Sequence, residues 1–406
     1  MPSAALTKAK VLVVDDYQGM RTILRDLVRS MGVSRVDTAA SGRDALNHLR
    51  TNRYDVVICD FNLGIGLNGQ QVLDEARLHD YIGVSTIWVM VTAEKTAEMI
   101  MGAAEAKPDE YLLKPINQNI LESRLERLIV KKQALRSVEE ALRGRDYATA
   151  LARCNQLLAG EGGKAPEILR IKSDLLLKLG DYAGAKTLFE SVLAARSVPW
   201  ARTGLGKVYF HQGQYEMARN QFRQVLEENR MFIEAADWLA KTYDAMGDKP
   251  QAQQVLQAAV KLSPNSAYRQ RALGETALRN GALDVAQSAF EKTIQISEFS
   301  SNKHPAAYVA LARVLSENDN PEEALKLLKR TNEVFKDSKD SVNIAIQAAA
   351  VQSAVHHKAG QAEEAQAAMA QVEALLASHA DKASPQTAME VAQSMLALGR
   401  KEQACA

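Results

Sequence analysis

The chain has 406 residues, and its 50 basic and 49 acidic residues give a net charge of +1. The length predicts two or more domains, and the balanced charge argues against direct nucleic-acid binding, which needs an excess of basic residues on one face. The longest apolar stretch, near residues 87–91, is far too short to cross a bilayer. Three widely separated cysteines, Cys59, Cys154 and Cys405, lack metal-binding spacing and predict reduced thiols in a cytoplasmic protein.

Short β-branched runs alternate with helical patterns up to about residue 116. The runs predict five strands, at residues 11–14, 35–38, 56–59, 87–91 and 111–113. Amphipathic stretches at residues 20–31 and 41–49 lie between them. This alternation predicts a doubly wound α/β domain with a five-stranded parallel sheet covered on both faces. In such sheets ligands bind at the carboxyl ends of the strands.

After residue 117 the chain has only helical patterns, broken by turns. One alanine follows each turn, with successive spacings of 35, 33, 34, 34, 38, 41 and 39 residues: Ala150, Ala185, Ala218, Ala252, Ala286, Ala324, Ala365 and Ala404. A small residue is needed where two helices cross closely, and a period near 34 indicates a two-helix repeat. The unit around Ala218 resembles the tetratricopeptide repeat family in Leu205, Gly206, Tyr209 and Phe222. The resemblance implies an all-α superhelix that binds protein partners.

Reactive side chains follow four of the five predicted strands. Asp15 and Asp16 follow the first strand, Asp60 and Thr92 end the third and fourth, and Lys114 follows the fifth. These residues should meet at one edge of the sheet, where three carboxylates are costly unless a hard cation such as Mg²⁺ neutralises them. A carboxylate can act as the nucleophile towards a phosphoryl group. A metal ion and a lysine ammonium can then neutralise the transferred charge.

This pattern resembles the flavodoxin-like receiver domain of bacterial response regulators over roughly residues 8–130. The resemblance implies that Asp60 is phosphorylated by a histidine kinase or a phosphotransfer protein. It also implies that Mg²⁺ is bound by Asp16, Asp60 and the backbone oxygen of Asn62, with Asp15 assisting.

The resemblance assigns roles to the neighbouring residues as well. Thr92 and Lys114 act with Asp60 in catalysis and read the phosphorylated state, and Tyr111 occupies the position of the family's switch aromatic. Asn62 and Glu94 flank the phosphate and influence its lifetime.

The loop after Asp60 departs from the family pattern. It contains no proline, and Gly69 lies nine residues after Asp60 where the family places a glycine eight residues on. This spacing predicts a one-residue insertion in the loop.

The predicted domains are a receiver at residues 1–130 and helical repeats at residues 131–406. Residues 117–143 between them read as one long helix, with leucines at a spacing of seven residues: Leu121, Leu128, Leu135 and Leu142. This spacing is typical of a coiled-coil seam between two copies of the chain. It is equally typical of a helix that completes the receiver and packs on the first repeat, and we favour this second interpretation.

The first helices of the repeats should line a concave binding face. The predicted partner-binding residues on that face are Arg170, Lys207, Phe210, Lys241 and Arg271. The recurring basic residues suggest a groove for an acidic peptide. The alternative is that Arg170, Lys241 and Arg271 pair within their own helices with acids four residues away, and we favour this alternative slightly.

Taken together, the patterns predict a response regulator of a phosphorelay whose phosphorylation state controls protein binding by the repeats. The only chemistry expected is self-phosphorylation and autodephosphorylation at Asp60. The expected partners are a histidine kinase or phosphotransfer protein, a protein bound by the repeats and, if the leucine seam is real, a second copy of the chain. Two other classes stay open: a transcription regulator whose repeats control DNA binding through a partner, and an enzyme with its site in the repeats.

Overall fold

The computed structural model describes residues 4–93, 105–160, 166–300, 303–379, 382–401 and 404. The described part of the first 115 residues is the predicted α/β domain, and its elements are α1 (Ala4–Thr7), β1 (Lys10–Val14), α2 (Gln18–Ser30), β2 (Arg35–Ala39), α3 (Gly42–Thr51), β3 (Val56–Asp60), α4 (Gly69–Leu78), β4 (Ile87–Thr92) and β5 (Glu110–Leu113). The strands pair in parallel in the order β2-β1-β3-β4-β5. Each predicted strand is present, within one residue of its expected ends.

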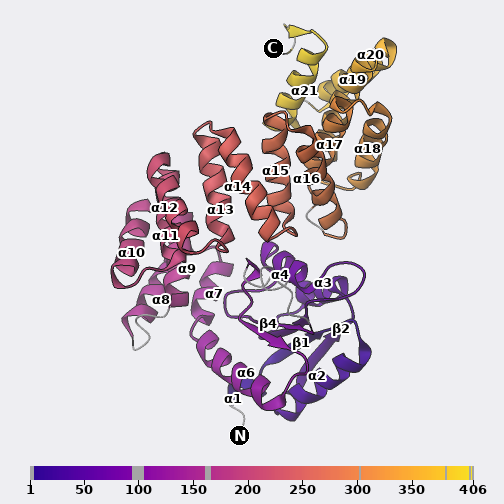
Figure 1. Ribbon diagram of the computed structural model, residues 1–406. Coiled ribbons are helices and arrows are strands. Elements are labelled where there is room, and N and C mark those ends of the chain that lie inside the picture. The colour runs from indigo at the N-terminus through magenta and orange to yellow at the C-terminus, as the bar shows by residue number, and fades with distance from the viewer. Residues whose placement is uncertain are drawn as a thin grey trace. The chain divides into compact units, whose positions relative to one another are not determined.

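Alternating side chains of the central strands pack on the two faces of this sheet. On one face, Val13 and Ile58 contact buried residues of α2 and of α6 (Gln118–Gln133), including Leu24 and Leu125. On the other face, strand residues such as Val57 contact α3 and α4. Figure 1 shows these helices on the two sides of the sheet. Because both faces are covered, polar groups are confined to the sheet's edges and strand ends.

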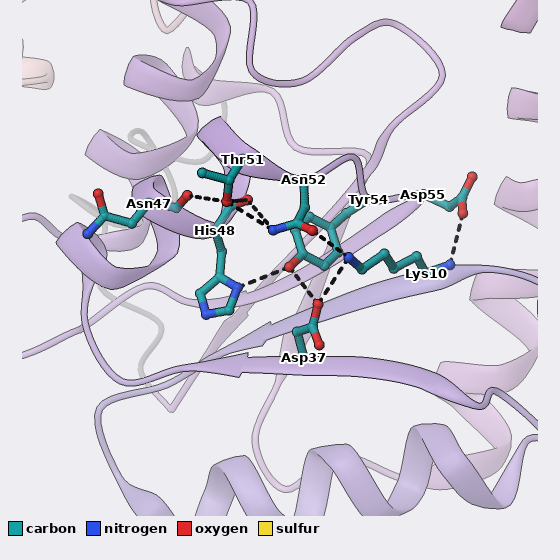
Figure 2. Close-up of polar contacts among 8 residues, drawn as sticks. All are labelled: Lys10, Asp37, Asn47, His48, Thr51, Asn52, Tyr54 and Asp55. Atoms are coloured by element: carbon teal, nitrogen blue, oxygen red, sulfur yellow. Dashed lines mark hydrogen bonds and ion pairs between the residues drawn. The ribbon is translucent and has the colours of Figure 1, made fainter.

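The edge strand β2 is fixed by a polar network around Tyr54, which Figure 2 shows. The Tyr54 hydroxyl donates to Oδ2 of Asp37 at 2.7 Å and lies 3.1 Å from Nδ1 of His48. Lys10 Nζ lies 3.3 Å from Asp37 Oδ2, donates to Asn52 at 2.8 Å and lies over the Tyr54 ring. Burial raises the pKa of Tyr54, and its bond to Asp37 raises it further, so the hydroxyl stays a donor at neutral pH. The network ties β2 to β1 and to the residues before β3.

The segment that follows the sheet is two helices and not the single helix predicted over residues 117–143. The first, α6, ends at Gln133, and α7 spans Arg136–Arg143 after a turn. Three of the seam leucines, Leu121, Leu128 and Leu135, are almost fully buried in the cores of this chain. They cannot form an exposed seam, so the interpretation as a coiled coil is wrong and the favoured packing interpretation is confirmed.

The turn before β4, at residues 83–86, packs closely against α7. Glu139 of α7 accepts a hydrogen bond from the backbone N–H of Ser85 at 2.7 Å and forms an ion pair with Arg143. A Cβ atom at Gly83 would collide with the Glu139 carboxylate, so a larger residue there would displace that side chain. Arg136 also pairs with Asp55 at 2.6 Å. These contacts hold α7 against the amino-terminal ends of β3 and β4.

The rest of the described chain is helical and forms two-helix units. The helices are α8 (Tyr147–Ala159), α9 (Pro166–Lys178), α10 (Tyr182–Ala195), α11 (Pro199–His211), α12 (Tyr215–Glu228), α13 (Ile233–Ala245), α14 (Lys249–Leu262), α15 (Ala267–Arg279), α16 (Leu283–Ile296), α17 (Pro305–Glu317), α18 (Pro321–Val334), α19 (Ser341–Lys358), α20 (Ala362–Ser378) and α21 (Pro385–Ala397). Within most units the turn contains a glycine with a positive φ, for example Gly213 at 73°. Arg145 and Asp319 take the same conformation in two units whose sequences are atypical.

The recurring alanines are buried, as predicted from the need for close helix crossing. Ala150, Ala218 and Ala286 are each fully buried within their units. Gly206 has a related role, because a Cβ atom there would collide with the ring of Phe222. Small residues thus set the approach of the two helices in a unit.

The described chain falls into two compact units, one formed mainly by Met1–Asp248 and the other by most of the chain from Lys249 onward. The first unit therefore contains the sheet and the first repeats together. The predicted boundary near residue 130 stays a prediction. Among the described residues, no helix combines the length and apolar character needed to span a membrane.

Candidate functional site

The candidate site lies at the carboxyl edge of the sheet, where Lys114 bridges two acids. Its Nζ atom lies 2.9 Å from Oδ2 of Asp15 and 3.0 Å from Oδ2 of Asp60. Asp15 is fully buried, and Asp60 is 7% exposed. Because β1, β3 and β5 run parallel, their carboxyl ends bring these three side chains together, as the sequence predicted.

Asp16 completes an acidic cluster with Asp15 and Asp60. One carboxylate oxygen of each lies within 4.8 Å of the others, a spacing that could hold a metal ion. Asp16 is exposed, whereas Asp15 also accepts a hydrogen bond from the backbone N–H of Tyr17 at 2.9 Å. Lys114 and Tyr17 already engage both carboxylate oxygens of Asp15. The carboxylates of Asp16 and Asp60 are therefore better placed to bind a metal ion. Oxygen donors of this kind suit Mg²⁺.

The electrostatics of the site follow from burial and from the ion pairs. Burial raises the pKa of the Asp60 carboxyl, the bond to Lys114 opposes that shift, and the neighbouring Asp15 charge adds to it. Burial acts to lower the pKa of Lys114, but its bonds to Asp15 and Asp60 outweigh burial and raise it. The ammonium group is therefore charged at neutral pH, and it balances part of the negative charge of the cluster.

Thr92 and Tyr111 lie beside the acidic cluster. Thr92 ends β4 and is 2% exposed, and Tyr111 lies on β5 opposite Met90. Burial raises the pKa of Tyr111, and the charge of Asp60 raises it further. The influence of Asp60 requires Tyr111 to lie near it, and Thr92 follows Val91, the residue of β4 that pairs with Asp60. The two proposed switch residues are thus adjacent to the proposed phosphoryl acceptor.

The loop after Asp60 contacts the site through glycines. Gly64 has a φ of 70°, and a Cβ atom there would lie 3.1 Å from Oδ2 of Asp16. The Asn62 side chain is exposed and accepts a hydrogen bond from the Gly64 N–H at 3.2 Å. A Cβ atom at Gly69 would collide with the backbone oxygen of Asp60. Glu94, the other residue assigned to phosphate lifetime, lies outside the described residues.

Three of the predicted partner-binding residues gather around one tryptophan of α13. Lys241 lies over the rings of Phe210 and Trp238, at 5.2 and 4.7 Å from their centroids. Lys207 lies 5.4 Å from the Trp238 ring and forms an ion pair with Glu234 at 2.6 Å. The structure therefore brings Lys207, Phe210 and Lys241 together, with the two cations stacked on aromatic rings.

The other two predicted residues have different partners. Arg170 lies over the ring of Trp200 at 5.2 Å. Arg271 belongs to the second compact unit and pairs with Glu275 at 2.8 Å, four residues along its own helix. The pairing expected within helices is thus confirmed for Arg271, whereas Arg170 and Lys241 contact aromatic rings.

Sequence reasoning missed several residues at this surface. Trp238 and Glu234 are central to the cluster, and Lys107 of the receiver also forms an ion pair with Glu234, at 2.9 Å. Lys132, buried at the end of α6, was missed as well. A tryptophan on the first helix of a repeat was the one available signal, because the ion pairs join residues distant in sequence.

Models of two families match the chain. The response regulator receiver domain matches residues 11–126. Tetratricopeptide repeat models match residues 135–198, 176–237, 209–275 and 277–348. The fold, the acidic edge and these matches define a response regulator: the chain belongs to that family through its receiver domain, and tetratricopeptide repeats follow the receiver.

Individual relatives are similar to the receiver part alone. Chemotaxis protein CheY of Pseudomonas aeruginosa is 31% identical over 119 residues, which are 29% of this chain and 94% of the relative. Chemotaxis protein CheY-3 of Vibrio cholerae is 32% identical over 119 residues, 29% of this chain and 90% of the relative.

Solved structures resemble each part separately. The structure of Vibrio cholerae CheY4 is 31% identical, has a TM-score of 0.28, and the match covers 30% of this chain and 98% of that one. The C-terminal part of a tetratricopeptide repeat-containing protein from Cytophaga hutchinsonii is 18% identical, with a TM-score of 0.47, covering 63% of this chain and 99% of that one.

Proposed function

We propose that this response regulator accepts a phosphoryl group on Asp60 from a histidine kinase or phosphotransfer protein, and that phosphorylation controls protein binding by its repeats. The observation that carries the proposal is the position of Lys114 between Asp15 and Asp60, at 2.9 and 3.0 Å. A carboxylate nucleophile beside a fixed ammonium and further acids matches the charge requirements of phosphoryl transfer.

The transfer forms one bond and breaks one bond. A carboxylate oxygen of Asp60 attacks the phosphorus of the donor's phosphohistidine, and the nitrogen–phosphorus bond breaks. The imidazole nitrogen keeps the bonding electron pair and takes up a proton from solvent. Autodephosphorylation then needs only water, whose oxygen attacks phosphorus and releases the Asp60 carboxylate and inorganic phosphate. No other catalytic activity is proposed for the chain.

Mg²⁺ fits the donor set of this site, because Asp15, Asp16 and Asp60 place three carboxylate oxygens within 4.8 Å. Asp16 and Asp60, with the backbone oxygen of Asn62, would hold the ion, and Asp15 would add charge next to them. A bound Mg²⁺ supplies neutralisation of the negative charge on the transferring phosphoryl group. Lys114 contributes from the protein itself, since its ammonium already pairs with the nucleophile.

Thr92 and Tyr111 are proposed to transmit the phosphorylated state. A phosphoryl group on Asp60 adds negative charge and acceptor oxygens, which the Thr92 hydroxyl and the Lys114 ammonium can bind. Tyr111 belongs to β5 and Lys114 follows it directly, so a displacement of these residues moves that strand. The repeats are proposed to present the output, with Lys207, Phe210 and Lys241 as part of the binding surface.

The test is phosphorylation by acetyl phosphate with Mg²⁺, followed by intact mass measurement. Wild-type protein should gain the mass of one acid-labile phosphoryl group, and Asp60→Asn should gain none. Asp26→Asn, which changes an exposed aspartate on α2, is the matched control and should be phosphorylated normally. Equal labelling of Asp60→Asn and wild type would contradict the assignment.

A further inference from the structure

A small cavity of about 210 Å³ opens on the first repeats of the chain. Side chains of both charges and large aromatic rings line it, among them Arg170, Asp174, Trp200, Lys207, Phe232 and Glu234. These residues come from α9 and α11 and from the start of α13. We refer to this cavity as the repeat groove.

One of the residues that line the repeat groove comes from the receiver. Lys107 belongs to the loop immediately before β5, and its Nζ atom lies 2.9 Å from Oε2 of Glu234. Lys107 has a φ of 47°, a conformation that is uncommon for a residue with a side chain. Arg77 of α4 holds the loop in place, because its guanidinium donates to the backbone oxygens of Ala106 and Lys107. Arg77 thus holds the backbone of the loop from which the Lys107 side chain reaches the groove.

The acidic groups of the repeat groove require cations. Burial acts to raise the pKa of Glu234, but Lys207 and Lys107 outweigh it and lower that pKa to about 2. Burial raises the pKa of Asp174, and Lys207, Lys107 and Arg170 oppose that shift. Two acids are therefore held in the groove with two cations of the repeats and one cation of the receiver. Without Lys107, Oε2 of Glu234 would lose its cation, while Oε1 would keep Lys207.

The cations of the repeats are already engaged. Lys207 pairs with Glu234 at 2.6 Å, and Arg170 stacks on Trp200. An acidic ligand would have to compete with Glu234 for Lys207 and would meet the charge of Asp174. Once Lys107 has left, a basic ligand can pair with Oε2 of Glu234 without displacing Lys207 from Oε1. The rings of Trp200 and Phe232 can cover its alkyl chain. The charge pattern therefore favours a cation as the ligand.

We propose that the repeat groove recognises a lysine or arginine side chain presented by a partner protein, and that Lys107 occupies this site within the free chain. The inference deepens the proposed function, on which it rests for the role of the repeats as the output. It differs from the acidic peptide that the sequence left as the less favoured interpretation, because the basic residues that suggested such a peptide have partners inside the protein. Lys107 then competes with the partner for Glu234.

The proposal is tested by titrating fluorescently labelled tetralysine and tetraglutamate into the full-length chain and following anisotropy. Lys107→Met vacates the site and should tighten tetralysine binding by about fivefold or more relative to wild type. Lys107→Arg keeps a cation in place and should bind like wild type. Adding Glu234→Gln to Lys107→Met removes the main acceptor and should abolish the gain.

Two controls separate this site from general charge attraction and from misfolding. Lys336→Met removes an exposed lysine elsewhere, changes the net charge equally and should leave tetralysine affinity unchanged. All variants should keep the wild-type circular dichroism spectrum, and Lys107→Arg tests the same position with its charge retained. Unchanged tetralysine affinity in Lys107→Met, or tighter binding of tetraglutamate than of tetralysine, overturns the proposal.

Phosphorylation of the same variants distinguishes the two proposals. If acetyl phosphate labels Asp60 but Lys107→Met does not tighten tetralysine binding, the groove assignment fails while the receiver assignment stands. If Lys107→Met tightens binding but Asp60 takes up no phosphate, the groove assignment stands and the proposed phosphorelay function fails.

Discussion

The Nζ atom of Lys132 lies 2.7 Å from Oε1 of Glu167, which joins the last turn of α6 to the first turn of α9. Lys132 also lies 2.8 Å from Oδ1 of Asp109, just before β5, and donates to the backbone oxygen of Val84 at 3.0 Å. The side chain of Lys132 is only 9% exposed. A single buried ammonium therefore connects the receiver sheet, the linking helix and the first repeats.

Replacing Lys132 by Met should destabilise the protein, because two acids lose a buried partner. Removing one member of a buried ion pair costs about 3–5 kcal/mol, and about 2–3 kcal/mol is expected here since Asp109 and Glu167 keep some contact with solvent. Urea unfolding of the two proteins measures the difference. Lys131→Met is the matched control: Lys131 also pairs with Glu167 but is 53% exposed, so its loss should cost less than about 1 kcal/mol. Equal effects of the two variants would contradict the role assigned to Lys132.

Asp60→Asn should increase the free energy of unfolding at neutral pH when Mg²⁺ is absent. The folded-state pKa of Asp60 is raised above its ordinary value of 3.8, so the stability linked to its proton is present in acid and is lost as pH rises through the folded pKa. Asparagine has no carboxyl group to ionise, so the variant does not lose this stability as the pH rises. The difference between the two proteins should be largest at neutral pH and should disappear as the pH falls to 3.8 and below.

The same pair of proteins should respond to Mg²⁺ to different extents. A ligand that binds only the folded state at 100 times its Kd adds about 2.7 kcal/mol of stability. Wild type should gain this stabilisation at saturating Mg²⁺, and Asp60→Asn should gain much less because one ligand carboxylate is missing. Urea unfolding with and without Mg²⁺ gives both comparisons, and equal stabilisation of the two proteins would contradict the metal assignment.

Gly64→Ala should weaken Mg²⁺ binding, because the added Cβ would lie 3.1 Å from the Asp16 carboxylate and hold it in a fixed position. Gly66→Ala is the matched control: Gly66 also has a positive φ, 118°, but a Cβ atom there meets nothing within 4 Å. Both variants should lose about 1 kcal/mol of stability from backbone strain. Only Gly64→Ala should change the Mg²⁺ affinity in a titration followed by thermal unfolding. A similar loss of affinity in both variants would assign the effect to loop strain alone.

The receiver site could be predicted from sequence because its geometry depends on topology. Parallel strands place their carboxyl ends at one edge whatever their side chains, so Asp15, Asp60 and Lys114 had to converge once the strands were identified. Burial gave the central strands β1, β3 and β4 nearly continuous apolar runs, which fixed their bounds closely. The positions of the repeat alanines were predictable for a similar reason, since close helix crossing requires a small residue at a fixed offset.

Other features could not be predicted, because they depend on contacts between distant parts of the chain. A spacing of seven residues between leucines fits both a coiled-coil seam and two packed helices, and only the turn at Ala134 and Leu135 decides between them. The sequence indicated no partner for Lys207, because Glu234 lies 27 residues on, in the next repeat. The contact from Lys107 to Glu234 spans 127 residues, so no local pattern could indicate it.

Phosphorylation of Asp60 should tighten tetralysine binding to the repeat groove through Lys107. Lys107 precedes β5 by three residues, and the same strand carries Tyr111 and leads to Lys114 at the proposed phosphorylation site. A new charge on Asp60 attracts Lys114, and a shift of β5 moves the Lys107 loop away from its partner in the groove. A ligand responds to such a change only if the two states differ in their affinity for it.

The measurement is the anisotropy titration with tetralysine, before and after treatment with acetyl phosphate and Mg²⁺. Allosteric couplings of about 1–3 kcal/mol correspond to changes of about 5–150-fold, so wild type should bind at least about five times more tightly after phosphorylation. Asp60→Asn should not respond to acetyl phosphate. Lys107→Met should bind tightly in both states, because its groove is already vacant. If Lys107→Met keeps the full wild-type response, the signal reaches the repeats by another route, and the Lys132 contacts with Asp109 and Glu167 become the connection to test.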